Sequence, residues 1–279
     1  MNFRRQAQPR PPFSAAQHRY SLHRDQVGFF QRHGYLHLRG YYDVPRRREL
    51  QSWVDAMQQW PETPFAFMQY FEDVAGRRTL CRMEYLLEYH EGLRAFVLDD
   101  PLRIPLSQLL GEPALLYKEK INFKLPGGQG FAAHQDAPAF LTGGQRYHIT
   151  AMISVDPSNE NNGCLEIASE DHAHVLRPQA ADGTLAADHA RCLRFRPLPT
   201  AAGDVIFFDS YVPHRSGPNR STAARRALYI TYNGRSAGDR RLQYFLDKRE
   251  RFPPECERVP GRDYAAGAAL YNLANPIRG

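Results

Sequence analysis

Residues 115–125 alternate between apolar and polar side chains, and this alternation constrains the fold more than any other segment. Successive side chains of a β-strand point to opposite faces, so the run predicts one long strand with two unlike faces. Its apolar face would carry Leu115, Tyr117, Ile121, Phe123 and Leu125, with Glu119 as the exception. Its polar face would carry Lys118, Lys120, Asn122 and Lys124, which either meet solvent or line a cavity.

Helical patterns precede this strand and short strand patterns follow it. The expected helices are 25–34, closed by Gly34, then 45–60, with Pro45 in its first turn, and 78–111, interrupted near Pro101. A strand is expected directly after Gly34. Later strands are expected at 130–136, 147–155, 163–168, 192–196, 204–208 and 225–233. Helices first and many short strands later predict an α+β fold, a jelly roll with helices bracing one sheet.

The length of 279 residues and the 42% hydrophobic content suffice for a buried core. The sequence contains no internal repeat and no second domain boundary, so residues 21–279 are expected to form a single domain. Residues 1–20 are rich in Pro, Arg and Gln and are expected to be a disordered basic tail.

The net charge of +6 is concentrated near the N-terminus, where residues 1–50 hold ten arginines against three acidic side chains. A nucleic-acid surface would draw on the folded body instead, so no nucleic-acid partner is expected. No apolar run approaches the roughly 18 residues of a membrane span, and no secretory signal is present. The four cysteines form no C-x-x-C pair, which favours reduced thiols in a cytoplasmic protein, with Cys164 packed in the core.

His134, Asp136 and His214 are the candidate metal ligands. His134 and Asp136 are two residues apart in an expected strand, so both side chains can reach one ion, and a distant strand would supply His214. Two imidazoles and a carboxylate are the ligands of a facial-triad Fe(II) site, which leaves positions open for O2 and a co-substrate.

Zinc is the alternative ion, since hydrolytic zinc sites use similar ligands. The helical H-E-x-x-H pattern of such sites is absent. His172 and His174 form a second H-x-H pair, which we interpret as a surface pair in a turn.

Arg225 begins an alternating run eleven residues after His214. An arginine facing the inside of a barrel would be a costly unpaired charge unless an anion met it, and a carboxylate fits its planar fork. A structural salt bridge is the alternative, and Arg226 is the other candidate for the inward position.

Together, His134-x-Asp136, His214, Ser216 and Arg225 resemble the phytanoyl-CoA dioxygenase superfamily, which comprises Fe(II)- and 2-oxoglutarate-dependent oxygenases on a double-stranded β-helix. The resemblance extends from about Val27 to Asn233 and includes a turn over residues 161–166, although the glycine that usually follows this turn is missing before His172. It implies that His134, Asp136 and His214 bind iron and form the catalytic centre.

Further roles follow from the same resemblance. Residues expected at 2-oxoglutarate are Arg225, Ser216, Asn122, Phe131 and Lys118. Residues expected at the substrate are Lys120, Phe140, Thr150 and Tyr229. The expected cofactors are Fe(II), 2-oxoglutarate and O2, with ascorbate as a candidate stimulant. Because Asp136 keeps its carboxylate, hydroxylation is favoured over halogenation.

The stretches that begin at Tyr117 and Tyr147 most resemble bacterial members of the 2-aminoethylphosphonate dioxygenase type. They imply hydroxylation of a small polar, anionic substrate with release of succinate and CO2, by a monomer or homodimer. A tailoring hydroxylase or desaturase of bacterial secondary metabolism is an alternative. A cupin-type metal enzyme and a binding module, neither of them using 2-oxoglutarate, are two further alternatives.

Overall fold

The computed structural model describes residues 19–141, 144–170, 172–274 and 277. Its strands are β1 (Tyr35–Leu38), β2 (Met68–Val74), β3 (Arg77–Glu84), β4 (Ala114–Lys124), β5 (Phe131–His134), β6 (His148–Ser154), β7 (Leu165–Ile167), β8 (Arg196–Leu198), β9 (Val205–Asp209), β10 (His214–Ser216) and β11 (Arg225–Gly234). Its helices are α2 (Arg24–His33), α3 (Val44–Gln58), α4 (Glu91–Leu98), α5 (Asp100–Leu110), α6 (Ala137–Leu141), α7 (Ala187–Cys192), α8 (Arg241–Arg251) and α9 (Ala265–Tyr271), with short 3-10 turns at Arg235–Ala237 and Glu255–Glu257.

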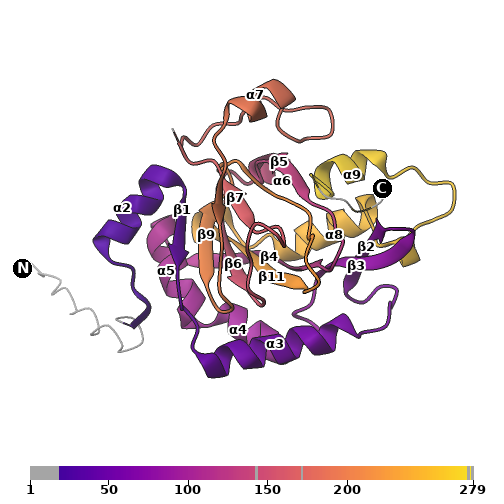
Figure 1. Cartoon of the computed structure of the whole chain (residues 1–279), viewed down its shortest axis with the longest axis horizontal. Helices are drawn as coiled ribbons and strands as arrows, with labels where there is room; N and C mark the ends of the chain where they lie inside the picture. The colour runs from indigo at the N-terminus through magenta and orange to yellow at the C-terminus, as the bar shows by residue number, and fades with distance from the viewer. Residues whose placement is uncertain (1–18, 142–143, 171, 275–276, 278–279) are drawn as a thin grey trace, which may run out of the picture.

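The strands within these described ranges form two antiparallel sheets. The larger sheet has the order β1-β9-β6-β11-β4-β3-β2, and the smaller has the order β5-β10-β7-β8. Side chains of β6, β9 and β11 pack against those of β7 between the sheets, among them Met152, Ile206, Tyr229, Leu165 and Ile167. The expected α+β jelly roll, or double-stranded β-helix, is therefore confirmed (Figure 1).

Helices cover the outer face of the large sheet. A core of apolar side chains joins α3, α4 and α5 to β4, β6, β9 and β11, and includes Val54, Phe96, Leu106, Phe123 and Phe207. The C-terminal helices α8 and α9 lie on the other side of the molecule, near the β2–β3 end (Figure 1). There they contribute Tyr244 and Phe245 to a second cluster with Tyr70, Tyr117 and Phe140.

The local signals for the first two helices are confirmed. Helix α2 ends at Gly34, which adopts the left-handed conformation (φ 69°) that glycine favours. Helix α3 begins after Asp43, whose carboxylate accepts the backbone N–H of Arg46, and Pro45 lies in its first turn. The strand expected after Gly34 is β1.

The helix expected over 78–111 is wrong for its first third, because residues 77–84 form β3, which pairs with β2 on one side and β4 on the other. The sequence there is rich in Arg, Leu, Met and Glu, which favour helices in isolation, and pairing with β4 overrides that preference. The β2–β3 turn places Ala75 at φ 51° and Gly76 at φ 79°. Alanine is an unusual residue for such a turn, which hides the hairpin signal.

The alternation predicted for residues 115–125 is interrupted. Thr231 pairs with Lys118 but Tyr232 pairs with Leu116, so Tyr117 is the extra residue of a β-bulge. As a result, Tyr117 packs with Phe140 and Tyr244, away from the face that carries Ile121 and Phe123. Glu119, the polar residue on the apolar face, forms an ion pair with Arg241 at 2.8 Å.

Two boundaries also differ from expectation. The strand expected at 192–196 is largely the end of α7 and the segment after it, and β8 spans Arg196–Leu198. Most of the expected tail at 1–20 lies outside the described residues, apart from Arg19 and Tyr20, which are helical. The four cysteines are free, and Cys164 is buried as expected.

Gly163 gives a test of how closely the loop before β7 packs on the end of β10. It has φ +74°, and a Cβ there would lie 2.1 Å from the carbonyl oxygen of Gly217. Gly76 has a similar φ of +79° with open space around it. We expect Gly76→Ala to lower the free energy of unfolding by about 1–2 kcal/mol. Gly163→Ala should cost about 1–3 kcal/mol more, because backbone must move.

Urea denaturation of both variants and the wild type measures this difference. If both variants lose the same free energy of unfolding, the close approach of Gly163 to Gly217 does not contribute to stability.

Candidate active site

The three predicted metal ligands converge at one point between the sheets. His134 ends β5 and His214 begins β10, and these two residues are directly paired across the strands. Their rings are 4.1 Å apart between centroids, and Nε2 of His134 lies 3.9 Å from a carboxylate oxygen of Asp136. One ligand atom from each residue lies within 4.8 Å of the other two. This spacing suits ligands around a single ion.

Backbone carbonyls orient both imidazoles for metal binding. Nδ1 of His134 donates to the carbonyl oxygen of Ala132 at 2.7 Å, and Nδ1 of His214 donates to that of Val212 at 3.0 Å. With the proton held on Nδ1, the lone pair of each Nε2 is free to bind a cation. The donor set therefore fits a divalent metal ion.

The ionisation states are also those of metal ligands. Burial lowers the pKa of His134 to about 3, and burial lowers that of His214 as well. Burial alone would raise the pKa of Asp136, but His214, Lys118 and Lys120 outweigh it and hold that pKa below its usual range. At neutral pH the site thus presents two neutral imidazoles and one carboxylate, the forms that bind metal without first losing a proton.

The second histidine pair is not the surface pair that was expected. The side chain of His172 is only 2% exposed, and its Nε2 lies 2.8 Å from Oδ2 of the buried Asp209. His174 is exposed and its Nε2 lies 3.2 Å from the same oxygen. The missing glycine before His172 therefore does not prevent this histidine from reaching the interior. Both imidazoles here lie within 3.2 Å of one carboxylate oxygen, whereas Nε2 of His134 is 3.9 Å from that of Asp136; His172, His174 and Asp209 are a second group with spacing that could hold a metal ion.

Arg225 faces the interior, as the sequence analysis preferred, and Arg226 faces out. Arg226 pairs with Asp156 at 2.7 Å and with Asp55 on α3. Arg225 is 1% exposed, and no carboxylate among the described residues pairs with it. Its Nη2 makes long contacts to the Tyr229 hydroxyl (3.4 Å) and the Met152 sulfur (3.7 Å), and its Nη1 has no partner. A buried guanidinium in this state fits an anion from outside the chain.

Lys124 is a residue of this end of the site that the sequence analysis did not select. It pairs with Arg225 across β4 and β11, and its Nζ donates to Ser216 Oγ at 2.7 Å. Burial, and then the charge of Arg225, lower its pKa to about 6. Its Nζ also lies 5.2 Å from the Phe131 ring. Arg225, Lys124, Ser216 and Phe131 thus lie together, two residues along β10 from His214.

The remaining predicted residues extend from this end along the inner face of the large sheet. Asn122 pairs with Ala227, and its side-chain oxygen is buried without a partner. Tyr229 lies between Arg225 and Lys120: its hydroxyl contacts Arg225, and its ring lies 5.2 Å from Lys120 Nζ. The Thr150 and Thr231 hydroxyls bond to each other at 2.9 Å.

Lys118 lies at the opposite end of β4 from Arg225. Its Nζ is 4.6 Å from the ring of Phe140 on α6 and 5.3 Å from that of Tyr244 on α8. Six residues separate Lys118 from Lys124, which corresponds to roughly 20 Å along a strand. The geometry places Lys118 beside Phe140 and not beside Arg225. Its role at 2-oxoglutarate stays a prediction.

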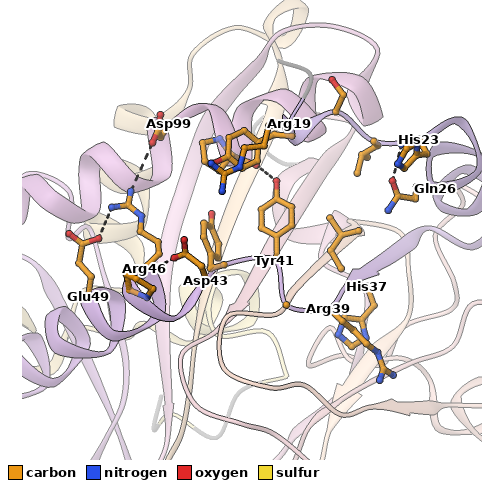
Figure 2. A pocket seen from close by; sticks show the side chains of 18 residues that line it. Arg19, His23, Gln26, His37, Arg39, Tyr41, Asp43, Arg46, Glu49 and Asp99 are labelled. Atoms are coloured by element: carbon orange, nitrogen blue, oxygen red, sulfur yellow. Dashed lines mark hydrogen bonds and ion pairs between the residues drawn. The ribbon is translucent and has the colours of Figure 1, made fainter. Parts of the chain in front are cut away.

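A cavity of about 1200 Å³ lies away from all these residues. Figure 2 shows it between the N-terminal segment, the loop after β1 and the start of α3, with charged side chains such as Arg46 and Glu49 paired to each other. It contains none of the predicted site residues. Cavity size alone therefore does not locate the chemistry. Within the described ranges, no helix is long and apolar enough to cross a membrane.

Two relatives share most of the chain. A 2-aminoethylphosphonate dioxygenase of the uncultured bacterium HF130_AEPn_1 is 49% identical over 247 residues, which covers 88% of this chain and 94% of the relative. A methylphosphonate hydroxylase of Gimesia maris is 39% identical over 227 residues, which covers 81% of this chain and 86% of the relative.

A solved structure, EctD from S. alaskensis with 2-oxoglutarate and 5-hydroxyectoine, superposes with a TM-score of 0.67 at 17% identity, covering 77% of each chain. It has the same fold. The family model of phytanoyl-CoA dioxygenase (PhyH) matches residues 30–227, a range that contains the triad and Arg225. The chain therefore belongs to the phytanoyl-CoA dioxygenase family.

Proposed function

We propose that this protein is an Fe(II)- and 2-oxoglutarate-dependent dioxygenase that hydroxylates a small anionic substrate of the 2-aminoethylphosphonate type and releases succinate and CO2. The observation that carries the proposal is the buried guanidinium of Arg225, which has no carboxylate partner among the described residues. Beside it, Nζ of Lys124 donates to Ser216 Oγ at 2.7 Å and to the carbonyl oxygens of Gly217 and Gly163, and Ser216 lies two residues along β10 from His214 of the candidate triad. A dicarboxylate that also chelates the metal matches both features.

Bound Fe(II) and 2-oxoglutarate would supply O2 activation and the oxidising equivalents. The chain supplies orientation and exclusion of water. Arg225 and Lys124 would hold the distal carboxylate, and Ser216 would donate a hydrogen bond to it. Asn122, with its unpaired side-chain oxygen, lies between that end and Lys120. Phe140 and Tyr229 wall the substrate space.

A phosphonate substrate is supported by the two relatives and by the lysine side chains near the metal ligands. Lys118 and Lys120 lie on the inner face of β4, and neither has a carboxylate within ion-pair distance among the described residues. The charges of both lysines act on Asp136, which places them near the metal centre. Two unpaired ammonium groups beside the reacting centre favour an anionic substrate.

A cupin-type metal enzyme or a binding module accounts less well for these residues. Neither activity needs a buried guanidinium without a carboxylate partner near the metal ligands, and such a cation is costly to fold. We further propose that residues 21–279 act as one catalytic domain, in the cytoplasm, as a monomer or homodimer without a nucleic-acid partner, with ascorbate as a stimulant.

Removing a metal ligand or the metal tests the reaction class. His134→Ala and Asp136→Ala should each lower succinate formation at least about 100-fold, because loss of a ligand weakens the metal and its geometry. A chelator should abolish turnover of the wild type, and Fe(II), but not Zn(II), should restore it. The matched control is His174→Ala, which removes an exposed imidazole outside the triad. Unchanged succinate release in both triad variants would refute the proposal.

The pH dependence of 2-oxoglutarate binding tests the role of Lys124. Its pKa in the free protein is about 6, and a bound dianion would raise that value. Affinity for 2-oxoglutarate should therefore weaken as the pH rises above about 6, where the free protein loses the ammonium proton. Both carboxylates of the ligand stay ionised there.

Titrations of 2-oxoglutarate into the Fe(II) protein between pH 5.5 and pH 8.5 measure the slope of its affinity against pH. Lys124→Met should bind more weakly at the low end and lose the slope, whereas a slope of equal size in that variant would exclude Lys124 as its origin.

A further inference from the structure

We propose that Arg82, Lys120 and Lys118 form a subsite for the phosphonate group of the substrate, separate from the carboxylate subsite at Arg225. This inference rests on the proposed function, because it assigns residues to the substrate of the same active site. Arg82 is the new element. The sequence analysis expected it in a helix, and nothing there suggested that it pairs with Asn122 on the inner face of the large sheet.

The guanidinium of Arg82 is buried and only partly paired. The residue is 2% exposed, and its Nη1 donates to Glu84 at 3.1 Å and, at 3.4 Å, to the carbonyl oxygen of Tyr271. Its Nε and Nη2 have no partner. These two atoms form one edge of the guanidinium, from which two parallel N–H groups can bind two oxygens of one oxyanion. Two unsatisfied charged donors in the interior are costly, and an arriving oxyanion removes that cost.

Glu84 does not cancel the charge of Arg82. Its other oxygen accepts Nζ of Lys248 at 2.6 Å, and both side chains are almost completely buried. Burial would raise the pKa of Glu84, but Lys248 and Arg82 outweigh it and bring that pKa to about 2. One carboxylate is thus shared between two cations. Glu84 binds Nη1 of Arg82, and the edge formed by Nε and Nη2 stays available for a ligand.

Two lysines of the neighbouring strand complete the subsite. Lys120 pairs with Glu84 across β3 and β4, and Asn122, the next residue on the same face, pairs with Arg82. The charge of Arg82 acts on both Lys118 and Lys120. Burial, followed by the charges of Arg82 and Lys118, lowers the pKa of Lys120 to about 7. Neither ammonium has a hydrogen bond or close ion pair among the described residues, although the charges of Asp136 and Glu84 act on both.

The number and arrangement of these donors favour a tetrahedral oxyanion over a carboxylate. The two free N–H groups of Arg82 would engage two oxygens, and the ammonium groups are left for a third oxygen and for the second negative charge. A phosphonate dianion has three oxygens and two charges, whereas a carboxylate has two oxygens and one charge.

The new subsite is distinct from the one at Arg225. Lys124 pairs with Arg225, whereas Arg82 pairs with Asn122 from the opposite side of β4. Standard strand spacings then separate the backbones of Arg82 and Arg225 by roughly 12 Å. Substrate and 2-oxoglutarate can therefore be held at the same time, each by its own cations.

The test compares Arg82→Gln with the wild type in the anaerobic Fe(II)–2-oxoglutarate complex. Isothermal titration with 2-aminoethylphosphonate should show affinity lowered between about 10-fold and 100-fold, the range for a lost charge-assisted contact. The titration is repeated with 3-aminopropanoate, which carries a carboxylate in place of the phosphonate. The wild type should prefer the phosphonate strongly, and Arg82→Gln should lose most of that preference. Arg77→Gln, an exposed arginine on the same strand, is the matched control.

The outcomes separate the subsite from the proposed function. If the wild type turns over 2-aminoethylphosphonate and Arg82→Gln binds it as tightly as Arg77→Gln does, the subsite is wrong and the function stands. If the wild type does not turn it over, methylphosphonate and inorganic phosphate are titrated instead. Binding that is lost in Arg82→Gln supports the subsite although the substrate differs, and binding unaffected by the substitution overturns it.

A folding defect in Arg82→Gln would be visible by circular dichroism. Lys120→Met then serves as the second variant, because Lys120 is partly exposed. Its loss of phosphonate preference supports the subsite, and unchanged preference overturns it.

Discussion

The two faces of β4 are the constraint on which the rest of the structure depends. One face packs Ile121 and Phe123 into the core beneath the N-terminal helices, and the other carries cations into the interior. Because β4 pairs with both β3 and β11, it sets the register of Arg82 on one side and Arg225 on the other. The bulge at Tyr117 lets the strand keep both faces along its length, while moving one aromatic side chain from the core to the cavity.

The triad could be predicted because its signal is local. The two-residue spacing of His134 and Asp136 predicted that both would reach one ion, and they do lie together, although the strand expected over 130–136 ends at His134 and Asp136 follows it. Family resemblance added the roles of His214 and Arg225. The residues that were missed depend on pairing between distant strands. Arg82 was missed because the β2–β3 hairpin carries Ala75 where a turn of this kind usually has Asn or Asp. Lys124 was on the predicted polar face, but only its register with Arg225 shows which lysine belongs to that end. His172 was judged by its turn sequence, and the buried Asp209 that holds it lies 37 residues away.

The interior concentrates charge that the fold itself does not neutralise. Glu84 pairs with both Lys248 and Arg82, but Nε and Nη2 of Arg82 and Nη1 of Arg225 have no partner among the described residues. Buried groups in this state lower the stability of the free protein and are oriented before any ligand arrives. Ligand binding should therefore stabilise the fold by mass action, in addition to starting the reaction.

Tyr229 joins the two halves of this arrangement. Its hydroxyl contacts Arg225 and its ring lies 5.2 Å from Lys120 Nζ, so a single side chain contacts one basic side chain of each proposed subsite. A ligand that draws one cation away from Tyr229 changes the environment of the other. Such a contact makes the two binding events thermodynamically linked, and linkage is reciprocal: whatever factor 2-oxoglutarate applies to substrate affinity, the substrate applies equally to 2-oxoglutarate. Tyr229 is therefore a side chain through which the two proposed subsites can be coupled.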